Sequence, residues 1–386
     1  MAESTYGGPE AGVLPIVPVR ARGMTIEGAD GRRYLDCLSG AGTLALGHNH
    51  PVVLEAMRRI IDSGAPLHVS DVATPVRDAF VAELSRTLPP GLAGRARVRF
   101  CGPAAGDARA TALHAVRAAA GRGDVLELTD ALFWSGGERA GGGALPAPGT
   151  RAAREPCAPR GPRAPCPVVA DETLTGLGRT GAFWAVEHSG STPDAMVLSA
   201  AAGGGLPLAV VVHRDDIDMR DGTRDAPTGN QLAMAAGTAT LAHVRENRLA
   251  DHAAALGTRI LARLRALAEE LGRVREVRGR GLLIGIELAD EVREHGDGSG
   301  AAPRAPRLPA AVRRECLRRG LLVDVGGPGG RVVRLLPPLT ITDEQATAVL
   351  DRFADALHAA TDDRSAPRGL PRGESRAPRG GRVRAG

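Results

Sequence analysis

Apolar and polar residues follow two alternating patterns along most of this chain. After Pro51 the apolar positions recur at helical spacing, whereas short apolar runs at 97–101, 125–128 and 168–171 end in, or are followed by, a turn residue or an acid. A helical pattern between the first two runs completes a strand–helix–strand unit, the building block of a sheet with mostly parallel strands. The pattern therefore predicts an α/β fold with a large, mostly parallel-sheet domain.

The second half of the chain predicts a smaller unit of helices and strands. One long amphipathic helical region should run from residue 230 to about residue 271. The shorter elements expected after it are strands at 282–288, 321–325 and 331–335 and helices at 310–319 and 342–359. The uncharged stretch 195–212 is interrupted by three consecutive glycines, so we expect a strand, a loop and a strand there, and no membrane helix.

Composition adds one unusual feature, the complete absence of lysine. All 49 residues counted as Lys or Arg are arginines, although lysine is among the commonest residues in ordinary proteins. The net charge of +5 is misleading, because residues 364–386 hold seven Arg and one Glu, a local charge of +6, which leaves −1 for the rest of the chain. The body of the protein therefore gives no indication of nucleic-acid binding.

Cysteines, histidines and the first residues indicate an ordinary cytoplasmic protein without metal. Five cysteines form an odd number with no CxxC spacing, which argues against a disulfide framework and against a zinc site. The opening MAESTYGGPE lacks a basic region followed by an apolar run, so no signal peptide is expected. His48 and His50 lie next to turns with no ligand partner at helical spacing, and we expect structural roles for both.

Six blocks of the chain resemble, in order, one known enzyme family. They read YLDCLSGAGTLALGHNHPVV, VRFCGPAAGDARATALHAVRAAAGR, VVADETLTGLGRTGAFWAVEHSGSTPDAMVLSAAAGGGLPLAVVV, GNQLAMAAGTATLAHVREN, VREVRGRGLLIGIELAD and VVRLLPPLTIT. Together they resemble class III aminotransferases, nearest the diaminobutyrate–2-oxoglutarate type. The resemblance implies a fold-type-I architecture, a homodimer with active sites between the subunits, the cofactor pyridoxal phosphate (PLP) and a small amino or keto acid as substrate.

The pattern and the resemblance together divide the chain into parts. Residues 1–45 are expected to be the N-terminal segment of the small domain. Residues 46–270 should form the large α/β domain, shortened and interrupted by an irregular Pro/Gly/Arg-rich linker at 140–167. The small C-terminal α+β domain should cover 271–361, and the Arg/Pro/Gly-rich tail 362–386 should be disordered.

The position that forms the cofactor linkage in this family carries alanine. In relatives a lysine directly follows the serine that matches Ser199, a residue beside the cofactor, whereas here Ser199 is followed by Ala200. An imine to the cofactor aldehyde needs a primary amine, which alanine does not have. Because the chain has no lysine at all, ordinary lysine-dependent transamination is excluded. PLP or pyridoxamine phosphate (PMP) should bind non-covalently or not at all.

Other positions that match the family's cofactor site are partly retained. Asp171 matches the carboxylate that pairs with the pyridine nitrogen, unless it is only a turn acid. Phe133 or Trp134 could stack on the ring or simply fill the core. Thr228 stands two positions after Ala226, which replaces a threonine that binds the phosphate in relatives. The phosphate-binding turn keeps its glycines but has no hydroxyls, so backbone amides alone are left for a phosphate. This turn, called the phosphate cup below, consists of Gly102, Pro103, Ala104, Ala105 and Gly106.

One arginine matches the family's substrate clamp. Arg334, in VVRLLPPL, stands where relatives hold a substrate carboxylate, a task that suits the guanidinium fork. Taken alone, one arginine among 49 would be a surface residue. Asp171 and Arg334 are therefore the candidate catalytic residues, whereas Arg179, Thr180 and Gly181 are interpreted as structural.

Three functions remain open. A pseudoenzyme of the aminotransferase fold, kept as a homodimer or as the partner subunit of an active paralogue, accounts for Ala200, the weakened cup and the shortened large domain. A repurposed lysine-free biosynthetic enzyme would use the old cleft, with non-covalent PLP or PMP or with no cofactor, and with Asp171, Glu172, His188 and Arg334 as reactive groups. A decaying gene product would barely fold, but six blocks with intact apolar patterning argue against it.

Overall fold

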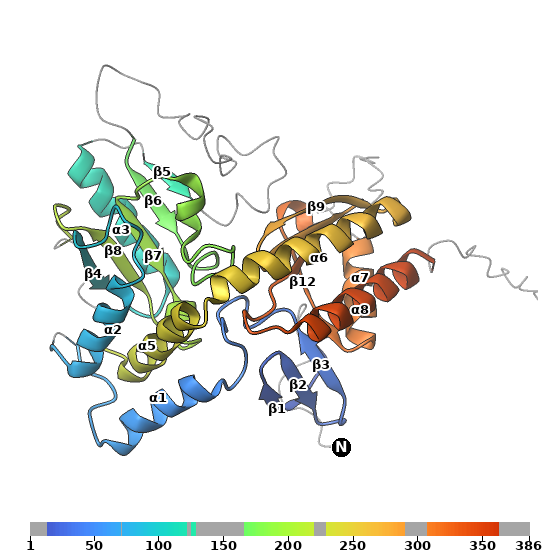
Figure 1. Ribbon diagram of the computed structural model, residues 1–386, viewed down its shortest axis with the longest axis horizontal. Helices are drawn as coiled ribbons and strands as arrows, with labels where there is room; N and C mark the ends of the chain where they lie inside the picture. Colours follow the sequence, from blue (N-terminus) through green and yellow to red (C-terminus); the bar gives the residue numbers. More distant parts are fainter. Residues whose placement is uncertain are drawn as a thin grey trace, which may run out of the picture.

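The computed structural model describes residues 14–70, 72–121, 125–128, 166–219, 229–289 and 307–362. They form a large lobe around a five-stranded sheet and a smaller lobe in which long helices cover a four-stranded sheet (Figure 1). The predicted α/β fold class is confirmed. Most of the predicted linker, 140–165, and the tail from residue 363 onward lie outside the described residues.

The described part of the large lobe contains α1 (Pro51–Asp62), α2 (Pro75–Ser85), α3 (Ala105–Ala120) and α5 (Gln231–Glu246). Local sequence explains where these helices begin. Two of them begin at a proline, whose restricted φ suits the first helical position. Thr74 caps α2 by accepting a hydrogen bond from the Arg77 amide at 3.1 Å, and Asn230 caps α5 through the Ala233 amide at 3.0 Å.

The sheet of the large lobe consists of β4 (Ala96–Phe100), β5 (Leu126–Leu128), β6 (Val168–Asp171), β7 (Ala195–Leu198) and β8 (Val210–Arg214). Its order is β4-β8-β7-β6-β5; β5, β6 and β7 run parallel, and β8 is antiparallel to both neighbours. Successive side chains point to opposite faces. Met196 and Leu198 therefore join the core that includes residues of α2 and α5, whereas Ala195 and Val197 pack with residues of α3.

The single helical region predicted from 230 to 271 is in fact two helices. Two residues separate the end of α5 from the start of α6 (Leu249–Leu271). Between them Arg248 adopts a left-handed φ of 51°, and the Asn247 side chain donates to the His243 carbonyl at 2.9 Å. A left-handed residue interrupts the helical hydrogen-bond ladder, so α6 leaves the large lobe and continues along the small one (Figure 1).

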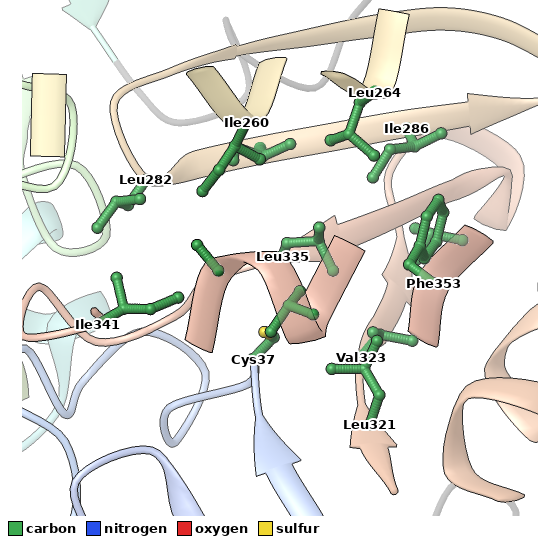
Figure 2. Close-up of a cluster of buried hydrophobic side chains, with 14 of the residues drawn as sticks. Cys37, Ile260, Leu264, Leu282, Ile286, Leu321, Val323, Leu335, Ile341 and Phe353 are labelled. Atoms are coloured by element: carbon green, nitrogen blue, oxygen red, sulfur yellow. The ribbon is translucent and has the colours of Figure 1, made fainter. Parts of the chain in front are cut away.

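The small lobe packs α6, α7 (Arg307–Arg318) and α8 (Asp343–Asp362) on an antiparallel sheet of order β12-β13-β10-β9. The strands are β9 (Val274–Arg280), β10 (Leu283–Leu288), β12 (Asp324–Gly326) and β13 (Val332–Leu335). In its core, Ile286 and Leu335 of the sheet lie close to Ile260 of α6 and Phe353 of α8 (Figure 2). β9 was not predicted, because four of its seven residues are charged and no apolar run marks it.

The N-terminal strands pack with a strand from near the other end of the chain. β1 (Pro18–Arg22), β2 (Thr25–Gly28) and β3 (Arg33–Asp36) form an antiparallel sheet. β11 (Leu321–Leu322) adds to it as a parallel neighbour of β3. The loop after β3 is thereby held beside the small lobe.

No helix within the described ranges is long and apolar enough to cross a membrane. The same residues contain no group of His, Cys, Asp and Glu side chains able to hold a metal ion. Cys37, Cys101 and Cys316 are free and buried. Cys166, however, is disulfide-bonded, which corrects the expectation drawn from the odd number of cysteines: one pair can form when the remaining thiols are enclosed in the core.

Buried histidines should make the stability of the fold depend on pH. Burial lowers the pKa of His50, His188 and His213 below the ordinary 6.5, because a desolvated site disfavours the charged imidazole. Below pH 6.5 the unfolded chain therefore binds more protons than the folded chain, and stability decreases as the pH falls.

A His213→Gln variant isolates this effect at one position. We expect the free energy of unfolding of wild type, relative to that of the variant, to decrease between about pH 7 and about pH 5. Urea denaturation at a series of pH values measures the difference. A difference that stays constant over this range would contradict a lowered pKa at His213.

Candidate functional site

The carboxyl ends of two neighbouring parallel strands bring the first candidate residues together. Asp171 is the last residue of β6 and pairs with Val197 of β7. Val197 lies two residues before Ser199. Asp171 is half-buried, and its Oδ1 accepts a hydrogen bond from the Thr173 amide at 3.1 Å. The carboxyl edge of such a sheet is where α/β proteins bind ligands. Asp171 and Ser199 thus lie at the same ligand-binding edge.

Ala200 is the first residue of a short 3₁₀ helix, Ala200–Gly203, that directly follows the strand end. Its amide donates to Ser199 Oγ at 2.6 Å. The turn packs on α5 so closely that a Cβ added at Gly204 would lie 2.8 Å from the Ala236 Cβ. The backbone at position 200 is therefore held in place, half-buried at the carboxyl edge, but it carries only a methyl group.

The expected phosphate cup is the turn between β4 and α3. Gly102 has a left-handed φ of 91°, and its carbonyl accepts from the Ala209 amide at 2.8 Å. α3 then begins at Ala105, and its N-cap residue Ala104 makes no side-chain hydrogen bond. Space is open beside Gly106, where an added Cβ would meet no atom within 4 Å. The helix start offers backbone N–H groups and its dipole to an anion, but no hydroxyl.

Arg334 lies on β13 of the small lobe and is already paired with an acid. Asp324, its direct antiparallel neighbour on β12, forms an ion pair with it, and both side chains are part-buried. Gly326 makes room for the guanidinium, because an added Cβ there would lie 3.0 Å from Arg334 Cζ and Nη2. Part of the guanidinium fork is thus engaged by an internal carboxylate, which a substrate carboxylate would have to displace.

Glu172, a reactive group in the repurposed-enzyme hypothesis, has a structural role. Its carboxylate accepts from the Thr175 hydroxyl at 2.7 Å and from the amides of Ala185 and Val186 at 3.0 and 2.7 Å. The residue is 2% exposed, and burial raises its pKa. A carboxylate with three internal donors holds the loop after β6 together, and it is not available to a ligand.

Two histidines also make internal contacts. His48 Nε2 lies 2.8 Å from Asp36 Oδ2 at the end of β3. His188, the other reactive group of the repurposed-enzyme hypothesis, lies 3.1 Å through Nε2 from Thr180 Oγ1 and is part-buried. Asp171 and Arg334 therefore remain the candidates from the sequence; both are half-buried, Asp171 at the carboxyl edge of the large sheet and Arg334 on β13.

The residues present fit non-covalent binding of the family's cofactor and do not fit covalent attachment. A half-buried carboxylate at position 171 suits a protonated pyridine nitrogen, and the amides at the start of α3 suit a phosphate. No side chain of the whole sequence offers a primary amine. Phe133, Trp134 and Thr228, the remaining predicted cofactor contacts, lie outside the described residues.

Comparison with known sequences agrees with the resemblance. A sequence model of the family described as "Aminotransferase class-III" matches residues 6–129 and 150–357. The diaminobutyrate–2-oxoglutarate aminotransferase of Rhizobium meliloti (strain 1021) is 36% identical, with 90% of this chain and 88% of the relative covered. The protein of the same name from Haemophilus influenzae is 33% identical, with 89% and 90% covered. The unmatched residues 130–149 overlap the start of the predicted linker.

Solved structures share the architecture. The N-acetylornithine aminotransferase of Stenotrophomonas maltophilia K279a superposes with a TM-score of 0.70 at 24% identity, covering 92% of this chain and 98% of that one. The ornithine delta-aminotransferase of Plasmodium falciparum reaches a TM-score of 0.73 at 22% identity, covering 93% and 97%. At these identities the likeness establishes a common fold.

Proposed function

The chain belongs to the class-III aminotransferase family, and from this membership we propose that it is a non-catalytic member that binds the cofactor without a covalent bond. One observation carries the proposal. Position 200, which follows Ser199 at the carboxyl edge of the sheet, is an alanine in a chain that has no lysine. Lysine-dependent amino transfer needs a primary amine at that point, so its absence removes the standard chemistry.

Asp171 and the start of α3 hold the cofactor in this proposal. The Asp171 carboxylate accepts a charge-assisted hydrogen bond from the protonated ring nitrogen, and the amides near Gly106 donate to the phosphate. When bound, PLP or PMP supplies a ring that withdraws electrons from an attached substrate. The chain's own groups bind and orient that ring, but no base follows Ser199 to move a proton.

Amino and keto acids are the ligand class that suits the cleft. Two relatives are named diaminobutyrate–2-oxoglutarate aminotransferases, and Arg334 offers a guanidinium to a carboxylate. Because Arg334 already pairs with Asp324, a ligand carboxylate has to replace the Asp324 carboxylate at the guanidinium. We therefore expect weak binding of such acids and no turnover.

A partner subunit is the role that best suits a folded, non-catalytic family member. Trp184, Phe80 and Phe353 are fully buried, and both lobes have contiguous apolar cores. Packing of this kind argues against a decaying product. The internal contacts of Glu172 weaken the repurposed-enzyme alternative. We propose that the chain acts as a dimer, either with a second copy or with an active paralogue.

Equilibrium dialysis with PMP, together with visible circular dichroism of the bound cofactor, tests the proposal. We expect saturable binding that is lost in Asp171→Ala, and no amino transfer from diaminobutyrate to 2-oxoglutarate. Turnover that co-purifies with the protein would overturn the non-catalytic assignment. Absence of PMP binding by a cooperatively folded protein would overturn the cofactor role.

Removing the Asp324 carboxylate, an internal partner of Arg334, should strengthen carboxylate binding. We expect Asp324→Asn to lower the Kd for 2-oxoglutarate about tenfold, equivalent to ~1.4 kcal/mol, because the guanidinium no longer exchanges one carboxylate for another. Isothermal titration calorimetry measures this Kd. Glu276→Gln, which removes a more exposed carboxylate of the same sheet, is the matched control and should have no effect. An unchanged Kd in Asp324→Asn would argue against Arg334 as the carboxylate site.

A further inference from the structure

Arg179 is a completely buried arginine that faces carbonyl oxygens instead of a carboxylate. Its Nη1 donates to the Pro337 carbonyl at 2.9 Å and its Nη2 to the Gly42 carbonyl at 3.3 Å. The residue is 2% exposed, and burial lowers the pKa of its guanidinium to about 10. Within the described part of the chain, no acidic side chain forms an ion pair with it.

The two acceptor carbonyls belong to segments that lie side by side. Backbone hydrogen bonds of 2.8 Å run from the Leu336 amide to the Cys37 carbonyl and from the Leu339 amide to the Ala45 carbonyl. They join the loop after β3 and the segment after β13 into one layer beside the small lobe. Arg179 comes from the loop that follows β6 of the large lobe, so its side chain fastens the two lobes together at this layer.

The backbone of Arg179 is fixed as closely as its side chain. Its carbonyl accepts from the Leu282 amide at 2.8 Å, in the turn between β9 and β10. Gly281 in that turn has a φ of 56°, and an added Cβ would lie 2.4 Å from the Arg179 carbonyl oxygen. Only glycine permits this approach. Position 179 therefore contacts three separate parts of the small lobe and its attached loop.

Keeping a buried guanidinium without a carboxylate is unfavourable, because desolvation penalises the cation. An apolar side chain of similar length would avoid this penalty, so the charge itself does not explain the choice of residue. The guanidinium does supply two donors at a fixed angle in one rigid plane. Two donors of this kind fix the relative position of two backbone segments, whereas the donors of a lysine ammonium rotate freely and methionine has none.

We propose that Arg179 is a positioning residue that fixes the geometry between Asp171 and Arg334. Asp171 ends β6, eight residues before Arg179 in the loop that follows, and Arg334 lies three residues before the acceptor Pro337. Arg179 therefore connects Asp171, which holds the cofactor ring in the proposed function, with Arg334, which holds the ligand carboxylate. This inference rests on the proposed function of those two groups and assigns to Arg179 the coupling between them.

Two ligands measure the coupling: PMP, which contacts the large lobe, and its reduced adduct with glutamate, whose carboxylates also reach Arg334. Joining two contacts in one molecule raises affinity only when the protein holds both sites in matching positions. In wild type we expect the adduct to bind about a hundredfold more tightly than PMP. In Arg179→Lys and Arg179→Met this gain should fall to about threefold or less, with the Kd of PMP itself unchanged.

Arg259→Met is the matched control, because Arg259 is an exposed arginine whose side chain pairs with Asp343. It should keep the full gain in affinity. A purely structural role for Arg179 would lower the binding of PMP and of the adduct together, so a parallel loss would overturn the proposal. An undiminished gain in both Arg179 variants would overturn it as well.

Hydrogen–deuterium exchange of the ligand-free protein tests the connection independently of any ligand. We expect both Arg179 variants to exchange the amides of Leu336 and Leu339 about tenfold faster, while β6 and β7 keep their protection. Faster exchange throughout the protein would indicate general destabilisation and overturn the positioning role. If wild type binds neither PMP nor the adduct but exchange rises locally in the variants, the proposed cofactor role fails and the lobe connection through Arg179 is supported.

Discussion

Ala200→Lys should convert the cleft from non-covalent to covalent cofactor binding. The backbone at this position is held by its hydrogen bond to Ser199 and by the packing of the turn on α5, so a longer side chain starts from a defined point at the carboxyl edge. A lysine there supplies the primary amine that no side chain of this protein carries. After borohydride reduction, PLP should remain attached in stoichiometric amount to the peptide that contains residue 200, and to no internal peptide of wild type.

The imine formed in Ala200→Lys should also raise the affinity for PLP. We expect the Kd to fall about a hundredfold, ~2.7 kcal/mol. Ala200→Arg adds a cation without a nucleophilic amine, and Ala201→Lys places the same amine at a neighbouring buried position. Neither control should be labelled. Equal labelling of Ala201→Lys, or no labelling of a folded Ala200→Lys, would mean that position 200 does not face the cofactor aldehyde.

Glu172→Ala should be strongly destabilising. The carboxylate accepts hydrogen bonds from the amides of Ala185 and Val186 and from the Thr175 hydroxyl. Alanine leaves these buried donors without an acceptor, and each unsatisfied amide costs about 1–3 kcal/mol. We expect the free energy of unfolding to fall by about 4 kcal/mol, a large part of what a typical domain has. Urea denaturation followed by far-ultraviolet circular dichroism measures the loss.

Two further variants show whether the loss comes from these hydrogen bonds. Glu172→Gln keeps one carbonyl acceptor and should lie between wild type and Glu172→Ala. Glu55→Ala removes an acid of similar size from the exposed surface of α1, where its pair with Arg59 is open to solvent; it should cost about 0.5 kcal/mol or less. If Glu172→Ala costs no more than Glu55→Ala, the two amides must find other acceptors.

Much of the fold follows from apolar periodicity. All five strands of the large sheet were predicted within a few residues, because each contains a short apolar or alternating run; β6, β7 and β8 are buried on both faces along most of their length. β9 was missed because its charged side chains pair across the sheet; Arg278, for example, bonds to Glu287 of β10 at 2.7 Å. The break between α5 and α6 was missed because the residue with the left-handed backbone conformation is Arg248, and no glycine or proline indicates a helix end there.

The candidate site was predicted in part. The resemblance named Asp171 and Ser199, and parallel pairing of β6 and β7 brings both to one edge of the sheet. It also named Arg334, but not its ion pair with Asp324. Arg179 was interpreted as structural only. Arg179 is the only charged residue in the run GLGRTGAF, and this was the feature of the sequence that could have indicated its burial.

The sequence by itself determined that lysine-dependent chemistry is absent, because an amine that no side chain carries cannot be supplied by any fold. Only the tertiary structure decided how the remaining polar groups are used. Arg179 bonds to carbonyls that are 158 and 137 residues away along the chain, and Asp324 engages Arg334 through strand pairing. Composition is a property of the chain, whereas burial and hydrogen-bond partners depend on which distant segments folding brings together.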